Sequence, residues 1–186
     1  MFVKSKNKKR LFVAVYPSGQ GTGTYHWALL VGPKVEGDAA AGQRYHVKNQ
    51  PVGPRWKYDP GDLQDVRVTA QLLARVTVAK IVNEKRLIKT LAKVPVDPPD
   101  WKGKADGSEP RWTCRVWVIA ALEAIRDDGK IVGTNCLDDI DGPNGIIERV
   151  KAFVASQIAG KRFSPPHDAM APKPLLNMLT GEELYL

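Results

Sequence analysis

The sequence predicts an α+β fold in which an antiparallel sheet packs on a buried helix. One observation is that strand-like runs of β-branched and aromatic residues fill the first 82 positions, whereas helical patterns follow them. A second is that 186 residues with 43% apolar side chains suffice for one domain with a sizeable core. We therefore expect a single domain over 1–186, with its core at about 11–163, a basic N-terminal tail and a Pro-rich C-terminal tail.

The expected strands come first along the chain. The runs 11–16 and 25–31 are separated by the turn-forming residues 17–23, which predicts two neighbouring antiparallel strands. A short third strand is expected at 44–48. Valine and isoleucine alternate loosely within 72–82, which indicates a further strand of the same sheet.

Three helices are expected after these strands. Asn83 can cap the first, an amphipathic helix that ends before the Pro-rich surface connection 94–110. The run 113–126 is apolar almost all round, which predicts a buried helix, and Gly129 ends it. The last is an amphipathic helix at 146–159, before the Pro-rich tail.

The net charge of +8 is a regional feature. Residues 1–96 contain 17 Lys or Arg and 6 Asp or Glu, whereas residues 97–186 contain 11 and 14. The excess of positive charge in residues 1–96 favours a polyanionic partner such as nucleic acid or anionic lipid. The alternative is that this charge only keeps the protein soluble. The first helix carries a basic ridge, which either binds the phosphates of a nucleic acid or is a helix face exposed to solvent. Its members are Lys85, Arg86, Lys89 and Lys93.

Export and membrane insertion are not expected. The apolar run that follows the basic start is six residues long, short of the ~7 to 15 of a secretory signal or the ~20 of a membrane span. Two cysteines are too few for a disulfide scaffold and lack metal-ligand spacing. We expect a reducing, cytoplasmic setting and neither a metal nor a cofactor.

Cys114 lies at the first turn of the predicted buried helix, directly after Thr113. A thiol there is close to the positive end of the helix dipole and to free backbone amides, which lower its pKa and can bind an oxyanion. The alternative role is that of a small buried residue. Cys136 precedes acidic residues that raise a thiol pKa, so it is not expected to be a nucleophile.

Two of the three histidines, His26 and His46, fall in strand-like runs, whereas His167 is expected at the surface. Adjacent antiparallel strands can bring His26 and His46 to one sheet face. There the first would deprotonate a thiol and the second would hold the imidazole in the required tautomer. Taken alone, each histidine is explained as a polar residue at a strand edge. Taken together with Cys114, the two histidines favour a catalytic set of a nucleophile, a base and a residue that orients the base.

These ordered residues resemble the circularly permuted papain-like group, which includes NlpC-type peptidases and relatives of lecithin:retinol acyltransferase. The likeness spans residues 11 to about 126. It rests on HWALLVG after position 25, on the second strand histidine, and on a cysteine that opens an apolar helix with Trp117 three residues on. The resemblance implies a permuted papain-like fold with Cys114 as nucleophile, His26 as base and His46 as the third polar member.

Over most of its length the chain also resembles short fungal proteins of the arginine-containing cyclodipeptide synthase type. The likeness lies in the order of YHWALLVGPK at 25–34, RYHVKN at 44–49, WKY at 56–58 and the helix that Cys114 begins. It implies that two aminoacyl-tRNAs, one of them arginyl-tRNA, are condensed to a cyclic dipeptide through an aminoacyl thioester, without ATP.

That resemblance implies further roles in substrate binding. The basic ridge would contact tRNA phosphates, which is a contact independent of sequence. Trp56 and Tyr58 would stack on the terminal adenosine or on the substrate side chain, unless they belong to the core. Glu123 would receive an arginyl guanidinium, unless it pairs with Arg126.

Two alternatives stay open. An NlpC-type amide hydrolase or a lipid acyltransferase would use the same three residues. Against them, the wall peptidases are usually exported, and the cysteine lies in a Thr-Cys-Arg-Val setting where the lipid enzymes have Asn-Cys-Glu-His. A non-catalytic nucleic-acid-binding module would keep the fold, and its function would not depend on Cys114.

Overall fold

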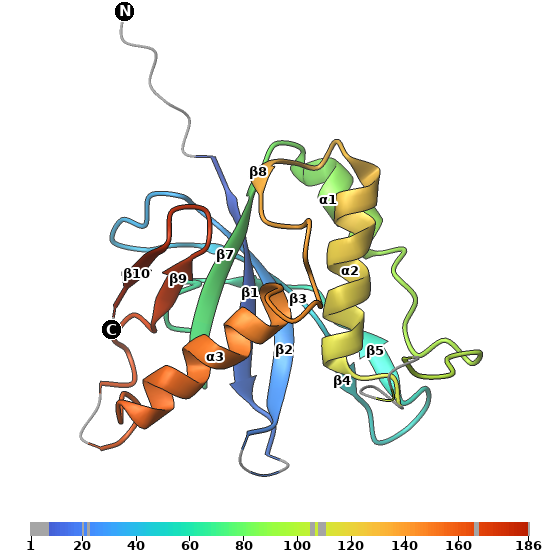
Figure 1. Ribbon diagram of the computed structural model, residues 1–186, viewed down its shortest axis with the longest axis horizontal. Coiled ribbons are helices and arrows are strands. Elements are labelled where there is room, and N and C mark those ends of the chain that lie inside the picture. Colours follow the sequence, from blue (N-terminus) through green and yellow to red (C-terminus); the bar gives the residue numbers. More distant parts are fainter. Residues whose placement is uncertain are drawn as a thin grey trace, which may run out of the picture.

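The computed structural model describes residues 8–19, 21, 23–104, 107, 111–165 and 168–185. The described chain is mixed α+β, as predicted (Figure 1). Its elements are, in order, β1 (Arg10–Pro17), β2 (Tyr25–Gly32), β3 (Gly42–Tyr45), β4 (Val47–Asn49), β5 (Trp56–Tyr58), β6 (Gly61–Leu63), β7 (Ala74–Ile81), α1 (Glu84–Leu91), α2 (Cys114–Asp128), β8 (Val132–Asn135), α3 (Ile146–Ala159), β9 (Leu175–Asn177) and β10 (Glu182–Leu184).

The main sheet has the strand order β10-β9-β7-β1-β2-β3-β6, with β8 also paired to β7, and β4 and β5 form a separate hairpin. The predicted antiparallel pairing of the first two strands is confirmed, with Val13 opposite Leu29. The pairing of β7 with β9 is parallel, so the sheet is not wholly antiparallel.

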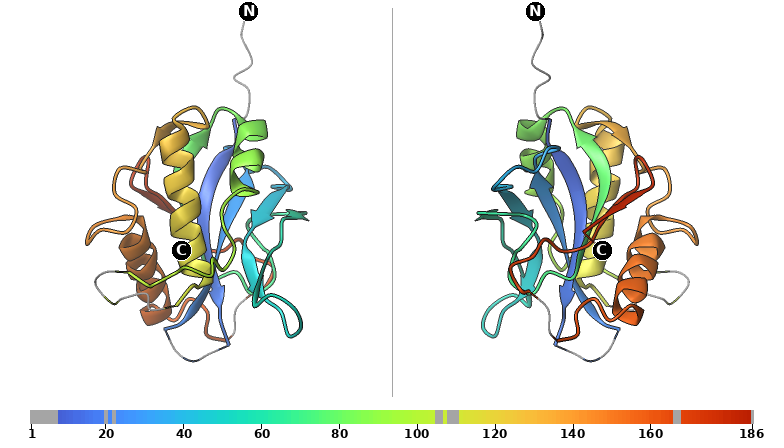
Figure 2. Two further views of the ribbon diagram at one scale, coloured as in Figure 1. Left: turned by 90° about the vertical axis from the view of Figure 1, so that its right-hand side faces the viewer. Right: turned by 90° about the vertical axis from the view of Figure 1, so that its left-hand side faces the viewer.

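Alternating residues of β1 and β2 face two different cores. One set, which includes Val13 and Leu29, packs with buried residues of all three helices, and Figure 2 shows α2 and α3 on the same side of the sheet. The other set, which includes Phe12 and Leu30, forms a smaller cluster on the opposite face. Burial on both faces explains why these strands read as nearly continuous apolar runs.

The predicted helices are confirmed, and capping residues mark the starts of two of them and the end of one. Asn83 accepts a hydrogen bond from the backbone N–H of Arg86 and begins α1, and Thr113 accepts one from Val116 and begins α2. Gly129 ends α2 in the left-handed region, at φ 68°. The last helix occupies the predicted range 146–159.

The single third strand predicted at 44–48 is wrong. The chain changes partner at His46: Tyr45 ends β3 opposite Leu29 of β2, whereas Val47 begins β4 opposite Tyr58 of β5. His46 therefore lies in a break between two strands of different sheets. The break separates its side chain from the regular alternation of either strand.

The predicted Pro-rich tail is part of the fold, so the expected core boundary near 163 is too short. Residues 175–177 add β9 beside β7, and Leu175 and Leu176 are buried. Each tail strand is only three residues long, too short for alternation to be read from sequence.

A buried ion pair on the second face of the sheet yields a stability prediction. Arg75 is 0% exposed, and two of its nitrogens lie 2.5 and 3.1 Å from the Glu36 carboxylate. Removing one partner leaves the other charge buried, so we expect Glu36→Ala to lower the free energy of unfolding by about 3 to 5 kcal/mol. Urea denaturation measures this, with exposed Glu182→Ala as control; a loss below about 1 kcal/mol, typical of a surface pair, would contradict it.

Candidate functional site

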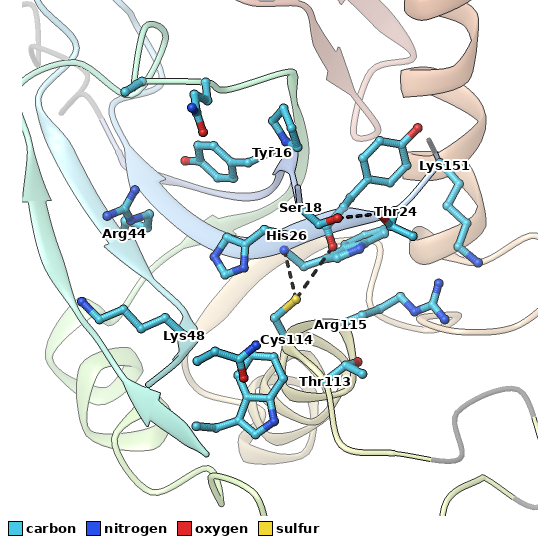
Figure 3. A pocket seen from close by; sticks show the side chains of 18 of the residues that line it. Tyr16, Ser18, Thr24, His26, Arg44, Lys48, Thr113, Cys114, Arg115 and Lys151 are labelled. Carbon is cyan, nitrogen blue, oxygen red and sulfur yellow. Dashed lines mark hydrogen bonds between the residues drawn. The ribbon is translucent and has the colours of Figure 1, made fainter. Parts of the chain in front are cut away.

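A cavity of about 620 Å³ opens where α2 begins, between that helix end and the start of β2 (Figure 3). Cys114 and His26 both line it, and so does Trp56 from β5. Figure 1 shows β4 and β5 beside this end of α2 and α1 beside the opposite end. Its size is that of a small-molecule or single-nucleotide site.

Cys114 reaches the cavity because β2 has an unpaired edge there. The first four residues of β2 pair with β1 but not with β3, whose ladder begins at Leu29. The Cys114 thiol occupies this edge: its Sγ accepts a hydrogen bond from Trp27 N at 3.4 Å and lies 3.9 Å from Tyr25 O. The nucleophile candidate is thus fixed between a helix end and a strand edge.

Burial raises the pKa of the Cys114 thiol above its ordinary value of 9.0, and hydrogen bonds from the backbone N–H groups of Trp27, Arg115 and Cys114 itself oppose this shift. The expected lowering of its pKa is therefore wrong. The helix-end amides do act on the sulfur, but the side chain is nearly excluded from water and burial outweighs them. The resting group is a thiol that needs a base.

This pKa yields a prediction for alkylation. In a Cys136→Ser background, we expect the rate of Cys114 modification by iodoacetamide to rise with pH through 7 to 9 without levelling off, because the thiolate reacts and its pKa lies above 9.0. Peptide mass spectrometry at graded pH measures the rate. A plateau reached below pH 7, as a preformed thiolate–imidazolium pair gives, would contradict the assignment.

A chain of hydrogen bonds leads from the cavity to a carboxylate. His26 Nε2 lies 2.7 Å from His46 Nδ1, and His46 Nε2 lies 3.3 Å from Asp59 Oδ2. Asp59 also pairs with Lys48 Nζ at 2.8 Å, and its backbone N–H donates to His46 O at 2.9 Å. We refer to His26, His46 and Asp59 as the relay.

The chemistry of the relay fixes its protons. A carboxylate only accepts, so neutral His46 donates from Nε2 and leaves Nδ1 as an acceptor. His26 must then donate from Nε2, which leaves its Nδ1 unprotonated. An imidazole in that tautomer is ready to take a proton from a thiol.

Both imidazoles of the relay are neutral at pH 7. Burial, and then the charge of Arg44, lowers the pKa of His26 below 6.5. The same two causes lower the pKa of His46 to about 4, although its hydrogen bond to Asp59 opposes the shift. A base with a lowered pKa stays unprotonated in mildly acidic solution, so this site can accept a proton over a broad pH range.

The structure brings the three predicted catalytic residues to one place. Cys114 and His26 line the same cavity. His46 is not among the described lining residues and contacts His26 through the hydrogen bond between their rings. Within the described part of the chain, Cys114 bonds to the β2 backbone rather than to His26. Nucleophile-to-base contacts often tighten only when substrate binds.

Sequence reasoning missed Asp59 and Arg44. The available signal for Asp59 was its place directly after β5, because the pairing of β4 with β5 puts position 59 beside His46. Arg44 lies on β3 opposite Leu30, and this register turns it to the same sheet face as His26. The sequence marks neither position as functional until the pairing of the strands is known.

The predicted substrate-binding residues separate into two groups. Trp56 lines the cavity, but it is also buried in the main core, and its buried Nε1 has no hydrogen-bond partner. Tyr58 instead packs on Trp117 of α2, with ring centroids 5.6 Å apart, so it is a core residue. Glu123 is exposed on α2 and is absent from the described cavity lining, so nothing in this geometry supports its role as a receptor for arginine.

The predicted basic ridge lies far from the cavity. Arg86 bonds to Asp128 through its Nε, at 2.6 and 2.7 Å, and Asp128 is the last residue of α2. Cys114 is the first residue of that helix, so about 20 Å of helix separate the two sites. Lys85, Lys89 and Lys93 are exposed at this far end.

The remaining sequence-based assignments concern the second cysteine, the third histidine and metals. Burial is the main cause of a raised pKa for Cys136, and nearby Asp138 adds to it, in the predicted direction. His167 lies outside the described residues. No cluster of three or more His, Cys, Asp or Glu suited to a metal occurs among the described residues. Of the helices in this part of the chain, none has the length and hydropathy that crossing a membrane requires.

Comparison with known proteins gives one relationship. Neither a curated protein nor a solved structure matches the chain. A family model described as "Family of unknown function (DUF6914)" matches residues 8–185, which is almost the whole sequence. The chain therefore belongs to the DUF6914 family.

Proposed function

We propose that this protein is a cysteine-nucleophile acyl transferase with a permuted papain-like fold. The observation that carries the proposal is the relay, whose hydrogen-bond pattern leaves Nδ1 of His26 unprotonated, together with the shared cavity that His26 and Cys114 line. A thiol with a raised pKa and a neutral imidazole with a lowered pKa suit general-base activation rather than a preformed ion pair.

In the proposed reaction His26 takes the Cys114 proton as the sulfur attacks an ester carbonyl. The backbone N–H groups of Cys114 and Arg115 at the start of α2 bond to the sulfur, and they would shift to the oxyanion as it forms. The carbon–oxygen bond then breaks, and the leaving alcohol receives the proton from His26. The product is a thioester on Cys114, which an incoming amine attacks to restore the thiol.

We propose an aminoacyl-tRNA as the acyl donor, because its ester is already activated and its ribose hydroxyl is the leaving alcohol. The amine of a second aminoacyl-tRNA would take the acyl group and form a dipeptidyl-tRNA. The free amine of that dipeptide would then attack its own ester, so the carbon–oxygen bond breaks, the second tRNA leaves and a cyclic dipeptide is released. Cationic side chains at the cavity, such as Arg44 and Lys48, support a polyanionic donor. The arginyl identity of one substrate rests on the family resemblance.

The test is intact-protein mass spectrometry of wild type and Cys114→Ala after incubation with a mixed aminoacyl-tRNA pool, with small-molecule analysis of the same samples. We expect an aminoacyl mass on the wild type, none on the variant, and an arginine-containing cyclic dipeptide only with the wild type. Cys136→Ser is the control and should behave as the wild type. If neither adduct nor cyclic dipeptide forms, tRNA-dependent synthesis is wrong, and amide and lipid acyl substrates are the next to test.

A further inference from the structure

We propose that the cavity binds a phosphate of the acyl donor, on a cationic wall formed by its own lining. The inference rests on the proposed function, because it names the group that holds the donor next to Cys114. The described residues that line the cavity include no aspartate or glutamate. They include five cations, which we call the cationic wall: Arg44, Lys48, Arg55, Arg115 and Lys151.

The cationic wall is assembled from segments far apart in the sequence. Its members come from β3, β4, the turn before β5, and helices α2 and α3. Figure 3 shows Arg44 and Lys48 on one side of the Cys114 sulfur and Arg115 and Lys151 on the other. Like charges brought together without acidic lining residues raise the energy of the empty cavity, and an anion lowers it.

Arg44 is the member whose charge acts on the relay. It is half-buried, its side chain bonds to the Tyr16 hydroxyl, its Nε is buried without a hydrogen-bond partner, and no ion pair joins it to any described acidic residue. Its charge also lowers the pKa values of His26 and His46, so the guanidinium acts directly on the relay. Lys48 and Lys151, by contrast, pair with Asp59 and Glu148.

The lining favours a phosphate group that carries a nucleoside. A guanidinium fork matches two oxygens of one phosphate. Beside the wall, Trp56 lines the cavity with an aromatic ring on which a base can stack. The cavity of about 620 Å³ suits a single unpaired nucleotide and excludes a duplex. We therefore assign the site to the single-stranded 3′ end that carries the acyl group.

The test compares two reagents that alkylate the same sulfur, anionic iodoacetate and neutral iodoacetamide, in a Cys136→Ser background. We expect Arg44→Gln to lower the ratio of the iodoacetate rate to the iodoacetamide rate about tenfold at low salt, because the wall attracts the anion. The matched control is Arg126→Gln, which removes an exposed arginine from the other end of α2 and should leave the ratio unchanged. An unchanged ratio in Arg44→Gln would overturn the proposal.

A protection experiment identifies the source of the phosphate. Adenosine monophosphate should slow iodoacetamide alkylation of Cys114, whereas adenosine should not. The RNA trinucleotide CCA should protect Cys114 at a lower concentration than the monophosphate does. Equal protection by monophosphate and trinucleotide would reassign the site to small phosphate esters, and no protection by either would overturn it. These readouts need no turnover, so they stand apart from the adduct test of acyl transfer.

Discussion

Replacing Cys114 by alanine is expected to lower the rate of acyl transfer at least about 1,000-fold, because the covalent step loses its only attacking atom. No other thiol can take its place: Cys136 lies outside the described cavity lining, where its Sγ is 3.6 Å from Met178 O. Single-turnover kinetics with a labelled aminoacyl ester measures the loss.

Two controls separate this loss from misfolding. Cys114 is 7% exposed and packs in the main core, so the alanine variant needs a denaturation curve beside its rate. Cys114→Ser keeps the side-chain volume and should also be inactive, because a hydroxyl is a far weaker acid than the thiol. Activity in either variant within about tenfold of wild type would mean that another residue carries the acyl group.

How much the sequence predicted depends on whether the signal is local. The strands at 11–16 and 25–31 and the helix that begins after Thr113 are confirmed, because apolar runs, turn residues and capping side chains act over a few positions. Cys114 could be placed at a helix start for the same reason. Its pKa could not, because burial comes from the packing of β2 against α2.

What the sequence did not reveal is tertiary placement. The basic ridge on α1 is visible in sequence because its lysines recur every four residues, and only the fold places it at the end of α2 opposite Cys114. The cationic wall is invisible in sequence because positions 44, 48, 55, 115 and 151 share no spacing. Asp59 escaped notice for a similar reason, since only the β4–β5 hairpin brings it beside His46.

Asp59→Asn is expected to reverse the direction of the hydrogen bonds along the relay and to lower kcat/KM by about 100-fold to 10,000-fold. Asparagine keeps the volume, but its amide can donate to His46 Nε2, where the carboxylate only accepts. His46 would then donate from Nδ1, His26 would accept at Nε2, and its proton would move to Nδ1. A protonated Nδ1 cannot take the thiol proton, which is the wrong-tautomer defect known for triads that lose their carboxylate.

The reversal has a signature besides activity. Nitrogen-15 NMR of the histidine rings should report His26 protonated on Nε2 in the wild type and on Nδ1 in Asp59→Asn. The matched control is Asp62→Asn, an exposed aspartate on β6 whose partner, Gln43, is outside the relay. It should keep both the tautomer and the rate. If Asp59→Asn loses activity while His26 keeps its Nε2 proton, Asp59 acts through the fold or through Lys48 and not through the relay.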